Sequence, residues 1–200
     1  MDLGFHTFMK RVFIIHGWGG YPEEGWFPWL KEELEKNNFE VFVPEMPNSE
    51  EPEINSWVNN LSEQVGQADE NTFFVGHSIG CQTILRYLET LNPEIKVGKI
   101  IFVAGWVNLL PVAIEEESAE EIAQPWLKTP LNWEKIKLHS DNFVTIFSND
   151  DLFVPESDAE IFKGKLNAKI IIENKKGHFS GEDGIKELPV VLNELLNKII

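Results

Sequence analysis

The feature that most constrains the fold is an alternation of short apolar runs with longer segments of helical spacing. Six runs are apolar almost throughout and do not alternate with polar residues: Val12–Ile15, Glu40–Val43, Thr72–Val75, Lys99–Val103, Phe143–Phe147 and Lys169–Ile172. Such runs are typical of strands buried on both faces. The helix-like segments are Trp26–Asn37, Glu53–Val65, Ile79–Leu91, Asn132–Leu138, Glu156–Leu166 and Ile185–Ile200. The alternation predicts an α/β fold, in which helices cover both faces of a parallel sheet and form a three-layer sandwich.

The size and charge of the chain narrow its class. At 200 residues it is long enough for one sizeable core, so we expect a single domain over 1–200. The formal net charge of −16 would repel a phosphate backbone or an anionic lipid surface, so neither nucleic acid nor membrane is an expected partner. The longest apolar stretch, Ile100–Ile114, is too short to span a bilayer. The run Val12–Ile15 is too short for a secretory signal, and with one cysteine in the chain we expect a cytoplasmic protein.

One segment, 105–130, breaks the alternation of strands and helices. It carries an acidic run, two prolines and two tryptophans, and it is long for a strand-to-helix connection. Long loops in compact domains are often lids over a binding site. A solvated surface helix with its flanking turns explains the same composition, so both interpretations stay open at this point.

A Gly-x-Ser-x-Gly string at Gly76–Gly80 directly follows the apolar run Thr72–Val75 and opens a helical pattern. The string alone is weak, but a serine on a sharp strand-to-helix turn must adopt strained dihedrals, and flanking glycines remove the Cβ atoms that would collide. Such a turn exposes its serine hydroxyl at the carboxyl edge of the sheet, beside a helix N-terminus that favours a developing anion. Ser78 is therefore the candidate nucleophile.

A serine nucleophile needs a base, and five histidines compete for that role. In hydrolases built on this turn, the chain order is serine, then an acid, then histidine. His77 cannot fold back onto its neighbour, His139 precedes its strand and so lies at the opposite edge, and His16 comes too early in the chain. His6 lies in a leader without a structural signal. His178 follows the last predicted strand and satisfies both the edge and the order.

The acid that orients the base is expected in the turn after the predicted strand Phe143–Phe147. Asp150 and Asp151 both lie there, at the same edge as Ser78. Successive side chains leaving a strand point to opposite sides, so only one of the two can face His178. The other is a candidate turn or capping residue.

An oxyanion needs two convergent backbone amides. One is expected from Ile79, and the other from the loop 16–20 after the first strand, where Trp18 is the candidate donor. A glycine-rich turn at that place can also cradle a phosphate, but the spacing of either nucleotide fingerprint is missing and the chain has only two arginines. We therefore assign no cofactor.

Aromatic residues near the predicted site are candidates for its walls. Trp106, Trp126 and Trp133 lie in or near connections on the site side and would line an apolar acyl pocket, although tryptophans also serve as packing anchors. Cys81 is expected to be a small buried residue. No group of histidines and carboxylates has metal-ligand spacing, so no metal is predicted.

With these motifs in place, the sequence resembles the small α/β-hydrolase-fold serine hydrolases of the YdeN and retinoblastoma-binding-protein-nine type. The resemblance covers nearly the whole chain from Arg11 onward. It rests on these stretches: Val12–Gly17, Trp26–Lys31, Met46–Asn48, Gly76–Gly80, Pro125–Trp126, Asn132–Ile136, Asp151–Pro155 and Gly177–Phe179. The resemblance implies the minimal α/β-hydrolase fold, with a six-stranded parallel sheet in the order 2-1-3-4-5-6. It also implies a triad of Ser78, Asp151 and His178.

The expected function is that of a serine hydrolase that cleaves small neutral acyl esters through an acyl-enzyme. The resemblance implies activity on small carboxylic esters and related acyl compounds, so a thioesterase or amidase is an alternative. A second alternative, from a different class, is a scaffold that keeps the fold and acts by binding a protein partner. The Leu-x-Cys-x-Glu string that binds retinoblastoma-type pocket proteins is missing around Cys81, so that kind of partner binding is not implied.

Overall fold

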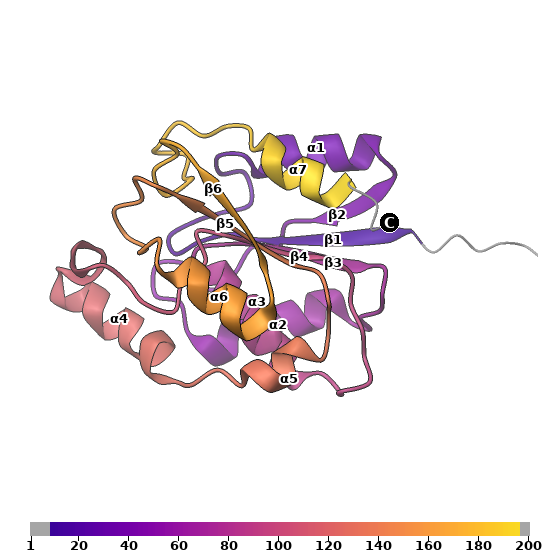
Figure 1. The fold of residues 1–200 in the computed structure, drawn as a ribbon, viewed down its shortest axis with the longest axis horizontal. Coiled ribbons are helices and arrows are strands. Elements are labelled where there is room, and N and C mark those ends of the chain that lie inside the picture. Colours follow the sequence, from indigo (N-terminus) through magenta and orange to yellow (C-terminus); the bar gives the residue numbers. More distant parts are fainter. Residues whose placement is uncertain (1–8, 197–200) are drawn as a thin grey trace, which may run out of the picture.

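A computed structural model describes residues 9–196, and a six-stranded parallel sheet forms the centre of this part of the chain (Figure 1). The strands are β1 (Lys10–Ile15), β2 (Phe39–Phe42), β3 (Thr72–His77), β4 (Ile100–Val103), β5 (Phe143–Ser148) and β6 (Lys169–Glu173). Their order is β2-β1-β3-β4-β5-β6, and all neighbouring pairs are parallel. The predicted sheet, its direction and its strand order are confirmed.

The helices cover both faces of the sheet, as predicted. They are α1 (Phe27–Lys36), α2 (Ile54–Val65), α3 (Ile79–Thr90), the 3-10 helix η1 (Pro111–Ile114), α4 (Glu117–Lys128), α5 (Trp133–Lys137), α6 (Asp158–Leu166) and α7 (Pro189–Leu196). Figure 1 shows α1 and α7 above the sheet, with α2, α3, α5 and α6 below it. The last predicted helix begins four residues later than expected, and its end lies outside the described residues.

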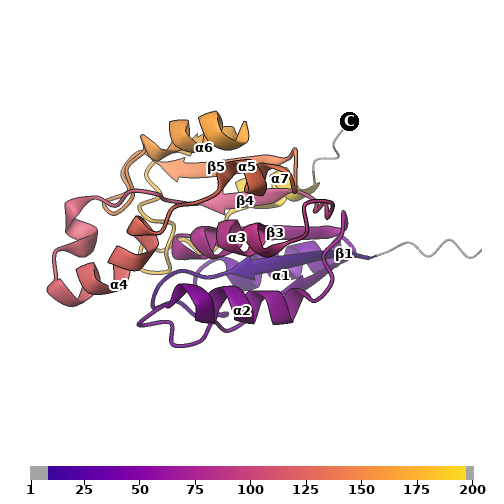
Figure 2. The same ribbon diagram turned by 90° about the horizontal axis from the view of Figure 1, so that it is seen from below.

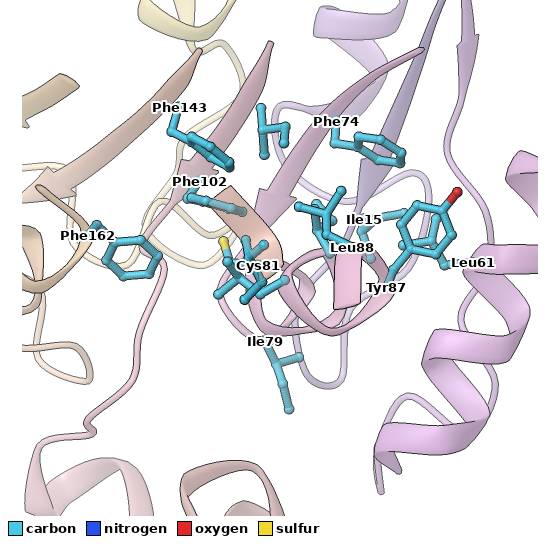
Figure 3. Close-up of a cluster of buried hydrophobic side chains, with 14 of the residues drawn as sticks. Ile15, Leu61, Phe74, Ile79, Cys81, Tyr87, Leu88, Phe102, Phe143 and Phe162 are labelled. Carbon is cyan, nitrogen blue, oxygen red and sulfur yellow. The ribbon is translucent and has the colours of Figure 1, made fainter. Parts of the chain in front are cut away.

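The continuous apolar runs are explained by burial on two sides. Along β1, Phe13 and Ile15 belong to the core on the α2 and α3 side, while Val12 and Ile14 belong to the core under α1 and α7. All four side chains are fully buried. Figure 3 shows part of the first core, where Phe74, Phe102 and Ile15 contact residues of α3. A strand with both faces covered has no position for a polar alternation.

The topology creates a crevice at one edge of the sheet. From β1 the chain crosses to β2 on one side, and later to β3 on the other. The loops after β1 and β3 therefore leave the carboxyl edge as neighbours, at the point where the strand order reverses. Ligands of open α/β sheets bind in the crevice at such a switch point.

The segment 105–130 contains η1 and the helix α4, which lies apart from the other helices, beyond the carboxyl ends of the strands (Figures 1 and 2). Most of α4 is solvated, because only Ala123 and Trp126 are buried. The Trp126 Nε1–H donates to the Pro52 carbonyl at 2.9 Å, and Arg86 donates to the Trp126 carbonyl at 2.9 Å. The segment thus includes a solvated surface helix, as one of the two interpretations expects, anchored near its C-terminal end. Its role as a lid stays a prediction.

Candidate active site

The turn between β3 and α3 holds Ser78 in a strained conformation. Its φ of 52° and ψ of −122° lie outside the regions that residues with a side chain normally occupy. The amide of Ser78 donates to the Val103 carbonyl at 2.9 Å, which fixes the turn to β4. The side chain borders the cavity at the carboxyl edge of the sheet.

The two glycines of the motif are required by the close approach of backbone on each side. A β-carbon on Gly76 would lie 2.8 Å from the Cα of Cys81. A β-carbon on Gly80 would collide with the Ile15 carbonyl oxygen and lie 2.6 Å from that of His16. Without a β-carbon at Gly76, β3 can lie close to the start of α3. Without one at Gly80, the start of α3 can lie close to the carboxyl end of β1.

The loops after β5 and β6 bring Asp151 and His178 together. Asp151 Oδ2 lies 2.8 Å from His178 Nδ1, and this carboxylate is 1% exposed. The other oxygen, Oδ1, accepts the amides of Phe153 at 2.8 Å and Val154 at 3.1 Å. The carboxylate is thus held by its own turn while it bonds the imidazole. The Phe153 ring packs edge-on against the His178 ring, with 5.2 Å between centroids.

Asp150 has the structural role predicted for the second carboxylate. Its Oδ1 accepts the Ser148 hydroxyl at 2.6 Å and the Gly177 amide at 2.9 Å. These hydrogen bonds, the one from Ser148 above all, lower the pKa of Asp150. Asp150 therefore ties the turn after β5 to the loop after β6 without facing the imidazole.

Ser78 and His178 border one cavity of about 820 Å³, although no hydrogen bond joins them among the contacts of the described residues. In enzymes without substrate, catalytic hydrogen bonds are often long or poorly aligned. Trp18 and Ile79 border the same cavity. Ile79 is the first residue of α3, so its amide has no acceptor within the helix. In the described part of the chain the Trp18 amide makes no hydrogen bond, whereas the next amide, that of Gly19, donates to the Ser49 carbonyl.

The walls of the cavity differ in chemistry. Its apolar lining residues include Trp106, Leu109, Ala113 and Phe153. The lining also includes glycines of the loops after β1 and β6 and carboxylates, among them Glu24. The cavity therefore offers room and apolar surface for an organic acyl group next to Ser78.

Two of the four tryptophans proposed for the site lie elsewhere. All four pack in or against the core on the α3 side, and of the four Trp18 and Trp106 also border the cavity, whereas Trp126 and Trp133 do not. Trp126 packs edge-on against Trp57, with 6.2 Å between ring centroids, and Trp133 packs against Phe162. Aromatic side chains bury large apolar areas, and here packing under α4 and α5 takes these two away from the site.

The remaining histidines in the described residues are buried and bonded to backbone. His16 accepts the Met46 amide at Nε2, and burial lowers the pKa of His16. Burial, and next the neighbouring His178, lower the pKa of His77 to about 3. His139 lies at the opposite end of the sheet, as predicted, and contacts the Ile95 carbonyl at 2.8 Å. His6 lies outside the described residues.

Cys81 and metal chemistry add nothing to this site. Cys81 is buried, and burial raises the pKa of its thiol. The described residues contain no group of three or more histidines, cysteines or carboxylates placed to hold a metal ion. Among these residues, no helix combines the length and the apolar character that crossing a membrane requires.

A comparison with models of protein families shows which family the chain belongs to. The model of the family described as "Serine hydrolase" matches residues 12–197. The chain belongs to the serine hydrolase family. Family membership supports hydrolase activity, and it agrees with a serine on a strained strand-to-helix turn.

Individual relatives match this serine hydrolase over almost its whole length. It is 32% identical to YdeN of Bacillus subtilis (strain 168) over 186 residues, which cover 93% of this chain and 94% of YdeN. It is 27% identical to the serine hydrolase RBBP9 of Rattus norvegicus over 189 residues, which cover 93% and 95% of the two chains. The crystal structure of YdeN matches with a TM-score of 0.84 and covers 93% of this chain and 96% of that one. The resemblance found in the sequence is confirmed.

Several residues at the site were not found from the sequence. Leu109, Ala113 and Tyr21 border the cavity; Leu109 and Tyr21 come from irregular segments and Ala113 from the short 3-10 helix η1, so none lies in a predicted strand or helix. The contact between His77 and the main chain of His178 was also missed, because the two residues are 101 positions apart. No sequence motif connects these residues to one another, so their proximity follows only from the fold.

Proposed function

We propose that this serine hydrolase is an esterase that cleaves small neutral acyl esters through a triad of Ser78, His178 and Asp151. The observation that carries the proposal is the hydrogen bond between Asp151 and His178, at the cavity into which a strained turn presents Ser78. A nucleophile, a base and an orienting carboxylate are the minimum for this chemistry.

The proposed reaction has two halves. The Ser78 oxygen attacks the acyl carbon, and its proton moves to Nε2 of His178. Asp151 accepts the Nδ1 proton of His178 in a hydrogen bond, so Nε2 is the free base. The negative charge of Asp151 stabilises the imidazolium that forms. His178 then gives the proton to the leaving alkoxide, which departs as the alcohol. A water molecule deprotonated by His178 hydrolyses the acyl-enzyme and restores the Ser78 hydroxyl.

The oxyanion of each tetrahedral intermediate is proposed to accept hydrogen bonds from the amides of Trp18 and Ile79. Both residues border the cavity beside Ser78. The start of α3 adds the partial positive charge of a helix N-terminus. Removing one oxyanion donor typically lowers kcat by about 10²–10³.

The cavity supports small organic esters as the substrate class. Its apolar lining residues, including Trp106 and Phe153, offer packing surface for the acyl group. The net charge of −16 disfavours anionic substrates, and the cavity contains a single lysine, Lys186. We therefore expect neutral esters to be hydrolysed faster than anionic acyl compounds.

The test is covalent labelling combined with one substitution. A fluorophosphonate probe should label Ser78, and Ser78→Ala should abolish both labelling and hydrolysis of p-nitrophenyl acetate. Ser180→Ala is the matched control, since Ser180 is another hydroxyl that borders the cavity. That variant should keep the label on Ser78. A wild-type protein that resists the probe and the ester would contradict the proposal and favour a scaffold that binds a protein partner.

A further inference from the structure

His77, the residue directly before Ser78, reaches the loop that carries the base. Its Nε2 lies 2.7 Å from the main-chain carbonyl oxygen of His178, and the two imidazole rings are 5.1 Å apart between centroids. The side chain is buried, and the rings of Trp26 and Phe27 pack against it edge-on. One side chain thus joins the turn of the proposed nucleophile to the loop of the proposed base.

The protonation of His77 follows from its partner and its burial. A carbonyl oxygen only accepts, so Nε2 carries a proton and donates a hydrogen bond to the carbonyl oxygen of His178. Burial lowers the pKa of His77 to about 3, so the ring is neutral above that pH and Nδ1 carries no proton. Nδ1 has no hydrogen-bond partner among the described residues and packs against Gly17, where a β-carbon would lie 3.1 Å away. The neutral ring places no positive charge beside the imidazole that would receive the proton from Ser78.

The loop that carries His178 needs such support, because its backbone is unusual. Gly177 has a φ of 54°, and Phe179 has a φ of 58° although it is not a glycine. A residue with a β-carbon is strained in this left-handed region. Four side chains hold the main chain of the loop. Asp183, from the same loop, accepts from the His178 amide, and three come from elsewhere: Asp150 at the Gly177 amide, His77 at the His178 carbonyl and Trp26 at the Phe179 carbonyl. Of these four, His77 is the one that comes from the turn of Ser78.

We propose that His77 is a positioning residue for hydrolysis, because its bond to the His178 carbonyl sets the place of the His178 imidazole relative to Ser78. The inference rests on the proposed function, since it assigns His178 as the base. His77 acts through His178 and does not take part in proton transfer. Its neighbour on the chain, Ser78, is fixed to β4 by its own amide, so the bond from His77 links the base loop to a turn that is itself held.

The expected effect of losing this bond is a loss of rate rather than of substrate binding. A misplacement of about 1 Å in a catalytic group can cost on the order of 10² in rate. His77→Leu should therefore lower kcat by about tenfold to a hundredfold. KM should change less than kcat, because His77, although it borders the cavity, is only 4% exposed, and the lining residues Trp106 and Phe153 come from other loops.

A set of three variants separates positioning from packing. His77→Leu removes the donor. His77→Gln keeps an amide N–H at the end of a side chain of similar reach, so it should recover most of the lost rate. His139→Leu is the matched control, because His139 is also fully buried, contacts a backbone carbonyl through one ring nitrogen and has no partner for the other. It lies at the far end of the sheet, so it should lose stability without losing kcat.

The measurements are kcat and KM for p-nitrophenyl acetate, the labelling rate with fluorophosphonate, and the downfield proton resonance of the His178–Asp151 hydrogen bond. In His77→Leu, kcat and the labelling rate should fall together and the resonance should shift, while in His139→Leu all three stay as in the wild type. The inference is wrong if folded His77→Leu keeps the wild-type kcat, if His77→Gln is as slow as His77→Leu, or if His139→Leu is equally slow. Wild-type protein that fails to label would instead contradict the proposed function, and the resonance would still report whether His77 positions His178.

Discussion

Replacing each of two adjacent carboxylates by its amide tests the assignment of Asp151 most sharply. Asp151→Asn and Asp150→Asn change one atom each in neighbouring residues and preserve shape. Asp151 bonds His178 through Oδ2 and two backbone amides through Oδ1. Asp150 accepts hydrogen bonds from the Ser148 hydroxyl and the Gly177 amide, both at Oδ1, and does not bond His178. The two substitutions should therefore differ greatly in effect.

The expected loss of kcat in Asp151→Asn follows from the orientation that the new side-chain amide must adopt. If its oxygen stays on the amides of Phe153 and Val154, its NH₂ group faces Nδ1 of His178. The reverse orientation points NH₂ at those two amides and loses both hydrogen bonds, at about 1 kcal/mol each plus the cost of leaving buried donors unpaired. The first orientation is favoured, and it forces the His178 proton onto Nε2. The imidazole then cannot take the proton of Ser78, and in the serine-protease precedent this wrong tautomer costs about 10⁴ in kcat.

Asp150→Asn should lower kcat by about tenfold or less, because the side-chain amide oxygen can still accept hydrogen bonds from the Ser148 hydroxyl and the Gly177 amide. Both variants are purified, shown to be folded by circular dichroism and thermal melting, and assayed on p-nitrophenyl acetate under identical conditions. The reasoning is refuted if Asp150→Asn is the inactive variant, or if both lose rate equally.

The remaining predictions concern the turn, the buried histidine and the substrate. Gly80→Ala should lose about 3 kcal/mol or more of unfolding free energy in urea, because its β-carbon collides with the Ile15 carbonyl; a loss below about 1 kcal/mol would contradict the close approach. The unfolded chain binds a proton at His77 near pH 6.5 and the folded chain only near pH 3, so folding stability should fall as the pH falls between these values, by up to about 1.4 kcal/mol per pH unit. His77→Gln should remove that part of the slope, and an unchanged slope would show that His77 already titrates normally in the fold. Hydrolysis of a neutral ester should exceed that of the matched acyl-CoA by about tenfold or more in kcat/KM, and faster acyl-CoA turnover would identify a thioesterase instead.

The strands were predictable because the sheet is buried on both faces. In β3, β4 and β5 every residue is buried, which gives continuous apolar runs, whereas the edge strands β2 and β6 have exposed positions. The helices between the strands fix their direction as parallel. The ends of the strands were less predictable, since polar residues also pair there. Arg11 lies within β1, for example, and its side chain donates to the Val65 carbonyl at 3.0 Å, a partner 54 residues away. The sequence around Arg11 contains no pattern that predicts this contact.

The place of the candidate site was predictable for a topological reason. In a parallel sheet every strand ends at the same edge, so residues that directly follow strands gather there whatever their separation in the chain. Ser78, Asp151 and His178 each follow a different strand. The choice between Asp150 and Asp151 needed the resemblance, because both residues occupy one turn and the contacts that separate them come from the loop after β6.

The walls of the cavity were not predictable in the same way. Trp106 and Trp126 are both buried aromatic residues of the segment after β4, yet Trp106 also borders the cavity and Trp126 does not. The difference is set by the packing of α4, which brings Trp126 against Trp57 and the Pro52 carbonyl. A tertiary contact of this kind leaves no trace in the local sequence.

The two nucleophilic side chains near the turn show how the fold selects between them. Ser78 and Cys81 are three residues apart, and a thiolate is the stronger nucleophile. The Cys81 thiol, however, is directed into the core, where it contacts the Val103 carbonyl at 3.5 Å and burial raises its pKa. The thiolate is therefore scarce, and no base adjoins it in the described residues. Ser78 precedes the helix in a conformation with positive φ, which turns its hydroxyl out of the helical path and toward the cavity. The strain of that one residue thus decides which of the two side chains a substrate can meet.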